Sequence, residues 1–450
     1  TYCCTKSTKL LMQCRRVVGK TWGLTPRVAY WLYHAVILPT ILYGSIIWWR
    51  RTSLKTCCKK LDSVQRLACL CISGAFRTTP TKAIEMILGI MPLSLNVLTK
   101  ALLTYHRLER NGLWGDENNT GHCSIANLMA GELPAALVPS DNVTKRVHFH
   151  QGYDVCVSER DVWNPDLITS WDPDMVIYTD GSRTNDGTGA GVFLDSWDQG
   201  ISLGLNHYNS VFQAELFAIL IAATDPRVCL ARRKRILICS DSQSALRAIS
   251  AYEYDSVLVG ECRMALERLS VRNNVRLIWV PGHSGVAGNE AADELAKAGT
   301  GLEPEEAALR VGASKSLVKR LTGDWATAKA SSEWLTLTGL RQSKIFIPGL
   351  NPGLSKILLR LGRKRLRLIC CMLTGHAALN RHLSLMQPGL DPICPRCRYA
   401  DETAEHVLLE CHAYDRQRVD ILGDYADRGS IFTKVGLNRL SKYIVALGRF

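Results

Sequence analysis

The most regular pattern of hydrophobic and polar positions lies between residues 174 and 300. Short apolar, β-branched runs alternate there with longer segments whose apolar residues recur at helical spacing. In chain order the pattern predicts strands at 175–179, 188–194 and 201–205, a helix at 210–223, a strand at 235–240, helices at 241–249 and 257–269, a strand at 275–280 and a helix at 287–299. This order is typical of a mixed α/β domain of about 125 residues.

The segments on either side have other patterns. Thr25 and Pro26 can begin a helix, and apolar residues recur at helical spacing in 61–76, so the N-terminal part is predicted to be helical. Gly, Asn, Pro and Asp then become frequent, which indicates a linker. The predicted divisions are 1–110 (helical region), 111–173 (linker), 174–300 (α/β domain), 301–343 (helical linker) and 344–450 (basic C-terminal region).

The longest apolar run, residues 35–49, contains Pro39 and is too short to span a bilayer. We therefore expect it to be buried core, and we expect no membrane association. The 17 cysteines, in a chain with no recognisable signal peptide, favour a reducing intracellular compartment. Because the sequence opens without Met, we expect it to be part of a longer polypeptide.

Charge is distributed unevenly along a chain whose formal net charge is +14 and whose hydrophobic fraction, 47%, excludes a disordered or fibrous protein. Residues 1–110 carry 17 basic and 3 acidic side chains, and residues 300–450 carry 23 and 14. The two segments between them are acidic overall. A solvated helix face explains a single basic run, but an excess of this size favours binding to a phosphate backbone. Nucleic acid is therefore the expected partner of the flanks.

Four acids occupy positions in the α/β domain where phosphodiester chemistry requires them. Asp180 is expected to end the first strand in a turn, Glu215 lies in the first helix, Asp241 ends the fourth strand, and Asp293 lies in the last helix. Each acid taken alone is explained as a turn residue or a helix cap, but the four acids together favour a metal site. Two Mg²⁺ ions about 4 Å apart would activate water and stabilise the leaving oxygen, and Mg²⁺ prefers carboxylate oxygens.

Several motifs resemble those of the type 1 ribonuclease H family: YTDGS (178–182), QAEL (213–216), SDSQSAL (240–246) and WVPGHSGVAGNEAADELAK (279–297). The resemblance implies a ribonuclease H-like mixed five-stranded sheet with helices. It implies that Asp180, Glu215, Asp241 and Asp293 bind two Mg²⁺ (or Mn²⁺) ions and that His283 assists catalysis from a mobile loop. Ser182 and Ser242 are expected to contact the phosphate backbone of an RNA–DNA hybrid.

A second cluster, Cys394-x2-Cys397-x8-His406-x4-Cys411, has the ligand types and spacing of a structural zinc site. His412 could replace Cys411 as the fourth ligand. The non-functional interpretation is that a Cys-rich chain produces such a cluster by chance. The cluster resembles the terminal CCHC-type motif of LINE-type retrotransposon polyproteins. The basic run before it is either a solvated helix face or a nucleic-acid contact, for which the candidates are Arg363, Lys364, Arg365 and Arg367.

Residues 7–49 resemble the thumb and connection of non-LTR retrotransposon reverse transcriptases of a jockey-like or related group. Tyr399-Ala400-Asp401-Glu402 is similar to the Tyr-x-Asp-Asp turn of reverse transcriptases, but it lies inside the zinc loop and ends in Glu. No polymerase active site is therefore expected in this chain. The resemblances imply a ribonuclease H enzyme acting on RNA–DNA hybrid beside element RNA and target DNA, in a cytoplasmic ribonucleoprotein and the nucleus. The alternative is a catalytically silent nucleic-acid-binding module.

Overall fold

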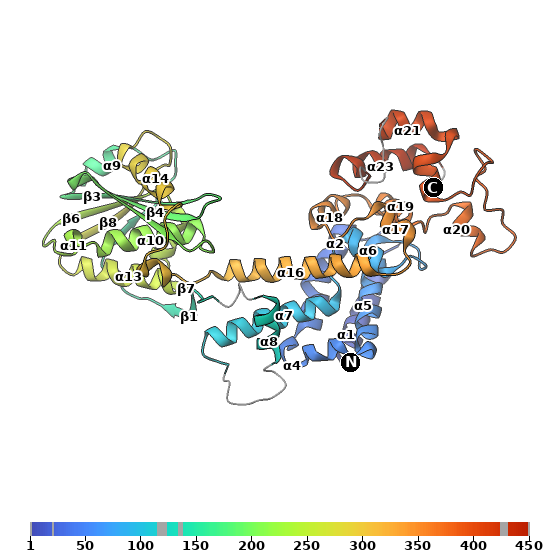
Figure 1. The fold of residues 1–450 in the computed structure, drawn as a ribbon, viewed down its shortest axis with the longest axis horizontal. Helices are drawn as coiled ribbons and strands as arrows, with labels where there is room; N and C mark the ends of the chain where they lie inside the picture. Colours follow the sequence, from blue (N-terminus) through green and yellow to red (C-terminus); the bar gives the residue numbers. More distant parts are fainter. Residues whose placement is uncertain (1, 20–21, 115–123, 134–137, 424–430, 449–450) are drawn as a thin grey trace. The chain divides into compact units, whose positions relative to one another are not determined.

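The computed structural model describes residues 2–19, 22–114, 124–133, 138–423 and 431–448 (Figure 1). The chain divides into two compact units. The sheet unit consists of residues 105–321, and the helical unit combines residues 1–104 with residues 322–450.

The sheet unit contains all the described strands of the chain. Its elements are α8 (Ser124–Glu132), β1 (Asn142–Val147), β2 (Asp154–Cys156), α9 (Asp166–Thr169), β3 (Met175–Arg183), β4 (Thr188–Leu194), η4 (Asp195–Trp197), β5 (Gln199–Leu205), α10 (Val211–Thr224), α11 (Pro226–Cys229), β6 (Arg235–Ser240), α12 (Gln243–Ser250), β7 (Glu253–Ser256), α13 (Val257–Ser270), β8 (Asn274–Trp279), α14 (Ala287–Gly299) and α15 (Glu306–Leu309). The strand and helix order predicted for residues 175–299 is found, which confirms the mixed α/β class.

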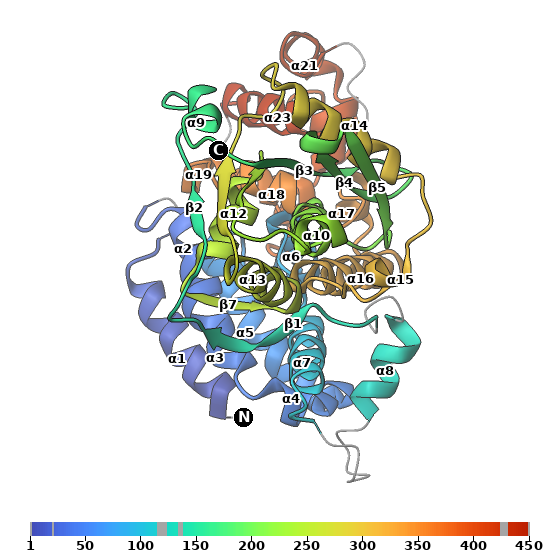
Figure 2. The same cartoon turned by 90° about the vertical axis from the view of Figure 1, so that its left-hand side faces the viewer.

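The main sheet has the strand order β2-β8-β6-β3-β4-β5. β3, β4 and β5 form an antiparallel meander, whereas β6, β8 and β2 run parallel to β3 and to one another. Side chains of β6 alternate between two cores: Ile236 and Ile238 pack with α10 and α13, while Leu237 and Cys239 pack on the α14 side. α10 and α13 thus cover one face and α14 the other (Figure 2).

The prediction of five strands was wrong by one, because the sixth comes from residues assigned to the linker. β2 pairs in parallel with Arg276–Ile278 of β8 at the sheet edge. A three-residue strand is too short to show an alternating pattern, and its neighbours are turn-forming residues. The same segment supplies β1, which pairs antiparallel with β7 in a separate two-stranded ribbon.

The first strand of the meander is also longer than predicted. Asp180, Gly181 and Ser182 were expected in a turn, but β3 continues through them to Arg183, and Asp180 pairs with Gly191 of β4. Turn-forming residue types misled the prediction, since pairing with a long antiparallel partner overrides local propensity. Asp180 therefore lies within a strand, on a rigid element.

The helical unit is built from both ends of the chain. Its elements are α1 (Tyr2–Arg16), α2 (Pro26–Leu32), η1 (Tyr33–Ile37), α3 (Leu38–Leu42), α4 (Ser45–Trp48), η2 (Trp49–Ser53), α5 (Lys55–Ser73), α6 (Thr81–Leu88), α17 (Arg341–Phe346), α18 (Pro352–Leu358), α19 (Arg363–Thr374), α20 (Asn380–Ser384), η5 (His406–Glu410), η6 (His412–Tyr414), α21 (Asp415–Leu422) and α23 (Lys434–Ala446). Two helices, α7 (Leu93–Arg110) and α16 (Lys315–Thr336), cross the division between the units.

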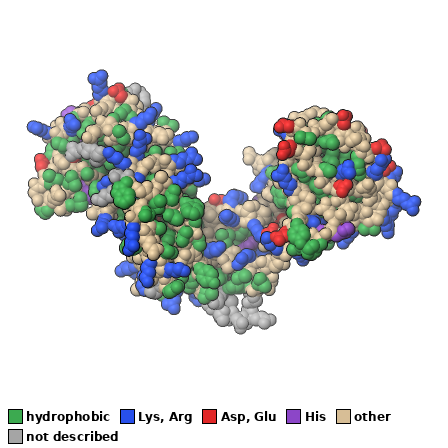
Figure 3. All heavy atoms as spheres, turned by 180° about the vertical axis from the view of Figure 1, so that it is seen from behind, with side chains coloured by type: hydrophobic (Ala, Val, Ile, Leu, Met, Phe, Trp, Pro, Cys, Tyr) green, Lys and Arg blue, Asp and Glu red, His purple; other side chains and the backbone are tan. Residues whose placement is uncertain are grey.

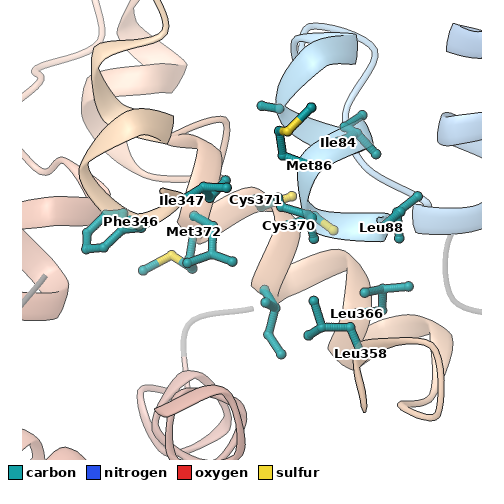
Figure 4. Close-up of a cluster of buried hydrophobic side chains, with 14 of the residues drawn as sticks. Ile84, Met86, Leu88, Phe346, Ile347, Leu358, Leu366, Cys370, Cys371 and Met372 are labelled. Atoms are coloured by element: carbon teal, nitrogen blue, oxygen red, sulfur yellow. The ribbon is translucent and has the colours of Figure 1, made fainter. Parts of the chain in front are cut away.

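One hydrophobic core joins the N-terminal and C-terminal parts of this unit. Ile84, Met86 and Leu88 of α6 belong to the same buried cluster as Leu366 and Cys370 of α19 (Figure 4). The hydroxyl of Ser355 also donates to the carbonyl of Ile87 over 3.2 Å. The two basic flanks of the sequence are therefore one structural unit.

The apolar run 35–49 is only partly buried, contrary to the prediction. Ile37 and Ile41 are in the core, but Tyr43 is 83% exposed and Ile47 is 71% exposed. Among the described residues, no single helix is long and apolar enough to cross a membrane, although two bent helix pairs reach that length and composition together, Pro26–Leu42 with Ser45–Ser53 and Thr81–Leu88 with Leu93–Arg110.

Candidate active site and metal centre

Three of the four predicted acids meet at the middle of the main sheet, where β6 ends beside β3. Ligand oxygens of Asp180, Glu215 and Asp241 all lie within 4.8 Å of one another. Thr179 of β3 is in register with Ser240 of β6, so the next residue of each parallel strand, Asp180 and Asp241, falls at the same level. The strands bring two carboxylates together, and α10 adds the third.

Helix α10 is set in place by its own start and by a glycine. Ser210 accepts from the backbone N–H of Gln213, and the Gln213 side chain accepts from the backbone N–H of Ser210, which confirms the capping box. A Cβ on Gly181 would lie 2.4 Å from the backbone nitrogen of Glu215. Only glycine allows this approach of helix to strand. Glu215 is thereby held against β3.

Burial, followed by the charge of neighbouring carboxylates, raises the pKa of all three carboxyl groups. The pKa of Asp180 is raised to about 7 by burial first and then by the charges of Asp241 and Asp293. Burial, followed by Asp180 and Asp241, raises the pKa of Glu215 well above its usual range, and burial also raises that of Asp241. In addition, Oε2 of Glu215 is buried without a hydrogen-bond partner.

This donor set fits Mg²⁺ or Mn²⁺. Three oxygen donors within reach of one ion, one of them otherwise unsatisfied, form a site for a hard divalent cation. The same three acids are costly to bury together as anions without such a cation.

Asp293 lies beside this group but outside it. Its Oδ2 is 2.6 Å from Nζ of Lys297, one turn further along α14, and its charge raises the pKa of each of the other three acids. The sequence-based expectation placed all four acids as equal ligands. In the structure, three are clustered and Asp293 is paired with a lysine, so its role as a ligand stays a prediction.

His283 lies in the loop between β8 and α14. Its side chain is 81% exposed, and its Nδ1 is 4.0 Å from Oδ2 of Asp293. The backbone of His283 has a φ of +52°, a left-handed conformation that is unusual for residues other than glycine. The imidazole is therefore close to the acids and open to solvent.

Two residues that the sequence analysis missed support Asp241. The indole Nε1 of Trp279 donates to the backbone carbonyl of Asp241 over 2.9 Å. Asn289, buried on α14, hydrogen-bonds the Asp241 side chain and thereby opposes the rise in its pKa. Both lie within the 279–297 motif, so their positions were visible in the sequence but their direction was not.

The serines predicted to contact phosphate are placed differently from each other. Ser182 is half-buried on β3, two residues beyond Asp180. Ser242 caps α12: its Oγ accepts from the backbone N–H of Ala245 and is 3.1 Å from Oγ of Ser244. Ser242 therefore already has a structural task, and phosphate contact by either serine stays a prediction.

The Cys/His cluster of the helical unit also comes together. Ligand atoms of Cys394, Cys397, His406 and Cys411 all lie within 4.8 Å of one another. Sγ of Cys394 is 4.0 Å from Sγ of Cys411, and Sγ of Cys397 is 3.3 Å from Nε2 of His406. His412 is not part of the group. Three thiols and one imidazole at these separations fit a tetrahedral Zn²⁺ site with no open position.

Surrounding groups orient the zinc-type ligands. Nδ1 of His406, the nitrogen turned away from Cys397, is 3.8 Å from Oε2 of Glu410. Such an outer carboxylate fixes the orientation of a ligating imidazole. Burial opposes ionisation of Cys397, but backbone N–H groups of Tyr399 and Ala400 outweigh it and lower the pKa of this thiol to about 6.

The basic run of α19 does not act as a unit. Arg363 is buried and donates to the backbone carbonyls of Leu24 and Cys71, so its predicted contact with nucleic acid was wrong. Lys364 and Arg365 are exposed to solvent. The guanidinium of Arg367 lies 5.0 Å from the ring centre of Phe76.

Comparison with known proteins agrees with the geometry of the sheet unit. Residues 172–301 match the RNase H family. The chain is 30% identical over 105 residues to "Retrovirus-related Pol polyprotein from type-1 retrotransposable element R1" of Nasonia vitripennis, covering 23% of this chain and 31% of the relative. It is 30% identical over 95 residues to "Putative 115 kDa protein in type-1 retrotransposable element R1DM" of Drosophila melanogaster, covering 21% and 9%.

A third relative is the Pol polyprotein of the R1 element of Bradysia coprophila, with 29% identity over 93 residues that cover 21% of this chain and 9% of the relative. The chain thus spans less than a third of the length of the curated relatives it matches. Residues 172–301 form a ribonuclease H domain, and the chain that carries it is homologous to Pol polyproteins of R1 retrotransposable elements.

Proposed function

We propose that the sheet unit hydrolyses the RNA strand of RNA–DNA hybrids in a reaction that depends on Mg²⁺, with Mn²⁺ as a substitute. The observation that carries the proposal is the cluster of Asp180, Glu215 and Asp241: the first two are buried, Asp241 is half-buried, and all three lie close together with raised pKa. Clustered acids of this kind mark sites that bind cations and act on phosphates.

The side chains have distinct parts in this proposal. Asp180 and Asp241 are held by paired strands, and Glu215 by a capped helix, so the three acids hold the ions without rearrangement. When bound, the ions supply an activated water and positive charge beside the leaving 3′ oxygen. Exposed His283 accepts or releases protons at the mouth of the site, and Asp293 with Lys297 sets the charge around it.

The helical unit fits the role of a nucleic-acid-binding partner of this nuclease. We propose that Cys394, Cys397, His406 and Cys411 bind a structural Zn²⁺ ion. Homology to R1 Pol polyproteins supports a place for the chain in a retrotransposable element. We propose element RNA and target DNA as its partners, in a cytoplasmic ribonucleoprotein and in the nucleus.

The test is hydrolysis of a labelled RNA–DNA hybrid by the full chain with and without Mg²⁺. We expect Asp241→Asn to lose several kcal/mol of transition-state stabilisation, a fall in rate of at least about 100-fold. Hybrid binding should change little. Asp198→Asn is the matched control, because this exposed acid lies in the β4–β5 hairpin and its left-handed backbone suits asparagine.

A wild-type chain that binds hybrid but leaves the RNA uncut at every Mg²⁺ and Mn²⁺ concentration would contradict the proposal. That result would favour the silent nucleic-acid-binding module. An unchanged rate in the Asp241→Asn variant would contradict the assignment of the site while leaving an enzyme.

A further inference from the structure

A cleft of about 460 Å³ opens in the helical unit, away from the cysteine cluster. Its lining comes from the end of α1, the end of α5 and the loop after it, α19, and the segment after α20. Its lining is mostly apolar apart from three arginines, and the described residues that form it include no Asp or Glu.

Three arginines from distant parts of the sequence meet at this cleft. Arg15, Arg77 and Arg367 line it, and among the described residues none of them is paired with a carboxylate. Nε of Arg367 is buried and has no hydrogen-bond partner. Like charges gathered without counterions are stabilised by an anion. Lys and Arg side chains are also spread over the face of the helical unit that Figure 3 shows, with little Asp or Glu among them.

Other arginines hold the walls of the cleft. Arg363, one turn before Arg367 on the same side of α19, donates to the backbone of Leu24 and Cys71. Arg66 donates to the carbonyls of Arg77 and Thr79 and thereby fixes the loop after α5. The backbone that carries Arg77 and the helix that carries Arg367 are therefore held before any ligand arrives, which lowers part of the entropic cost of binding.

The rest of the lining is apolar and includes an aromatic ring. Leu67, Leu70, Ala75 and Met386 form this surface, and Phe76 is half-buried beside Arg367. Inorganic phosphate would leave the apolar part unused. A ligand with phosphates and flat bases uses both parts, because guanidinium groups pair with phosphate and bases pack on aromatic and aliphatic side chains. The volume is that of a small-molecule pocket, so the cleft has room for unpaired nucleotides.

We propose that this arginine cleft binds a single-stranded segment of nucleic acid, with Arg15, Arg77 and Arg367 on its phosphates. The inference does not depend on the nuclease activity, because the cleft and the carboxylate cluster belong to different units. It replaces the basic run as the nucleic-acid contact of the C-terminal region: of that run, only Arg367 reaches the cleft.

The test compares two double variants of the full chain, each lacking two positive charges. Arg15→Gln with Arg77→Gln removes charge from the cleft. Lys434→Gln with Lys442→Gln removes the same charge from exposed positions of α23 outside it. The probe is a labelled, unstructured single-stranded RNA of about 12 nucleotides. Its fluorescence anisotropy is followed over a series of KCl concentrations in buffer without Mg²⁺.

We expect the cleft variant to bind at least about 10-fold more weakly and its dependence of log K on log salt to be shallower by about 1.4, which corresponds to two lost phosphate contacts. The control variant should stay within about 2-fold of wild type. Equal losses in both variants, or unchanged affinity and slope in the cleft variant, would overturn the proposal.

Two further arms separate the explanations. Inorganic phosphate that displaces the RNA as effectively as a mononucleotide would show a site for free phosphate and would overturn binding of a strand. Circular dichroism and hybrid cleavage, measured on both variants, should match wild type. Cleavage by the wild type reports on the sheet unit alone, so failure of the nuclease proposal and failure of the cleft proposal give different results.

Discussion

The buried acids of this chain differ in the group that can neutralise them, a divalent cation in one case and a lysine in the other. Asp180, Glu215 and Asp241 repel one another in a group that a divalent cation would neutralise. Glu85 of α6 is fully buried in the helical unit, where Nζ of Lys82 lies 3.1 Å from its Oε2. Burial raises the pKa of Glu85 to about 7 even though Lys82 opposes the shift.

Glu85 predicts a pH dependence of stability. Because its pKa is higher in the folded chain than in the unfolded one, its contribution is fully present below about pH 4 and is lost as the pH rises through about 7. Between pH 5 and pH 8 the ionisation of Glu85 should lower the free energy of unfolding by on the order of 2–3 kcal/mol. The Glu85→Gln variant should not show this decrease. The measurement is the free energy of unfolding in urea at both pH values.

Asp62→Asn is the control for this prediction, because Asp62 is half-exposed and only 3.9 Å from the same lysine. It should leave the pH dependence nearly unchanged. If Glu85→Gln follows the wild-type curve from pH 5 to pH 8, the prediction fails.

Single residues also show what the sequence could and could not reveal. The motifs predicted the three clustered acids and the four cysteine and histidine side chains that come together. Arg363 was misread because its charge was weighed without its spacing: it shares the buried face of α19 with Leu366 and Cys370, three and seven residues on. Trp279 and Asn289 were missed because side-chain direction is a tertiary property.

At the scale of elements, the main surprise is how much of the predicted linker is folded. Asp141 is buried and accepts from the hydroxyl of Ser256, the backbone N–H of Leu258 and the side chain of Gln213. Its own backbone N–H donates to Ala313. One acid thus joins the starts of α10 and α13 to segments on both sides of the residues that match the RNase H family. Turn-rich composition concealed it, since its partners are distant in sequence.

Asp141→Ala should destabilise the sheet unit by about 2–4 kcal/mol, because several buried donors would lose their acceptor at once. Thermal unfolding measures the effect. Asp154→Ala, which removes an exposed acid of β2 paired only with Arg276, should change stability by less than about 1 kcal/mol. Equal effects of the two variants would argue against a structural role for Asp141.

At the scale of the whole molecule, the proposed zinc site joins the shared core of the helical unit. Cys394 and Cys411 belong to that core, the hydroxyl of Tyr443 donates to the carbonyl of Val407, and Arg418 donates to that of Cys411. A metal at the cysteines would therefore stabilise α21 and α23, because these helices hydrogen-bond to a ligand, Cys411, and to Val407, the neighbour of the ligand His406.

Removal of zinc should loosen one unit only. We expect a zinc chelator, or Cys397→Ser, to speed amide hydrogen exchange in α23 by at least about 10-fold while β6 exchanges as before. Metal analysis of the purified chain should give one zinc, and Cys229→Ser, at an exposed cysteine outside the cluster, should keep it. Unchanged exchange in α23 after complete loss of zinc would contradict a structural role.

The interleaved order of the two units has a consequence for biosynthesis. Because α6 packs against α19, almost three hundred residues later, the core of the helical unit cannot be completed until the last quarter of the chain has been translated. The sheet unit, whose residues are contiguous, can fold in the meantime. Nascent chains stalled before α19 should thus already contain a protease-resistant sheet unit, while residues 1–104 still need protection from aggregation.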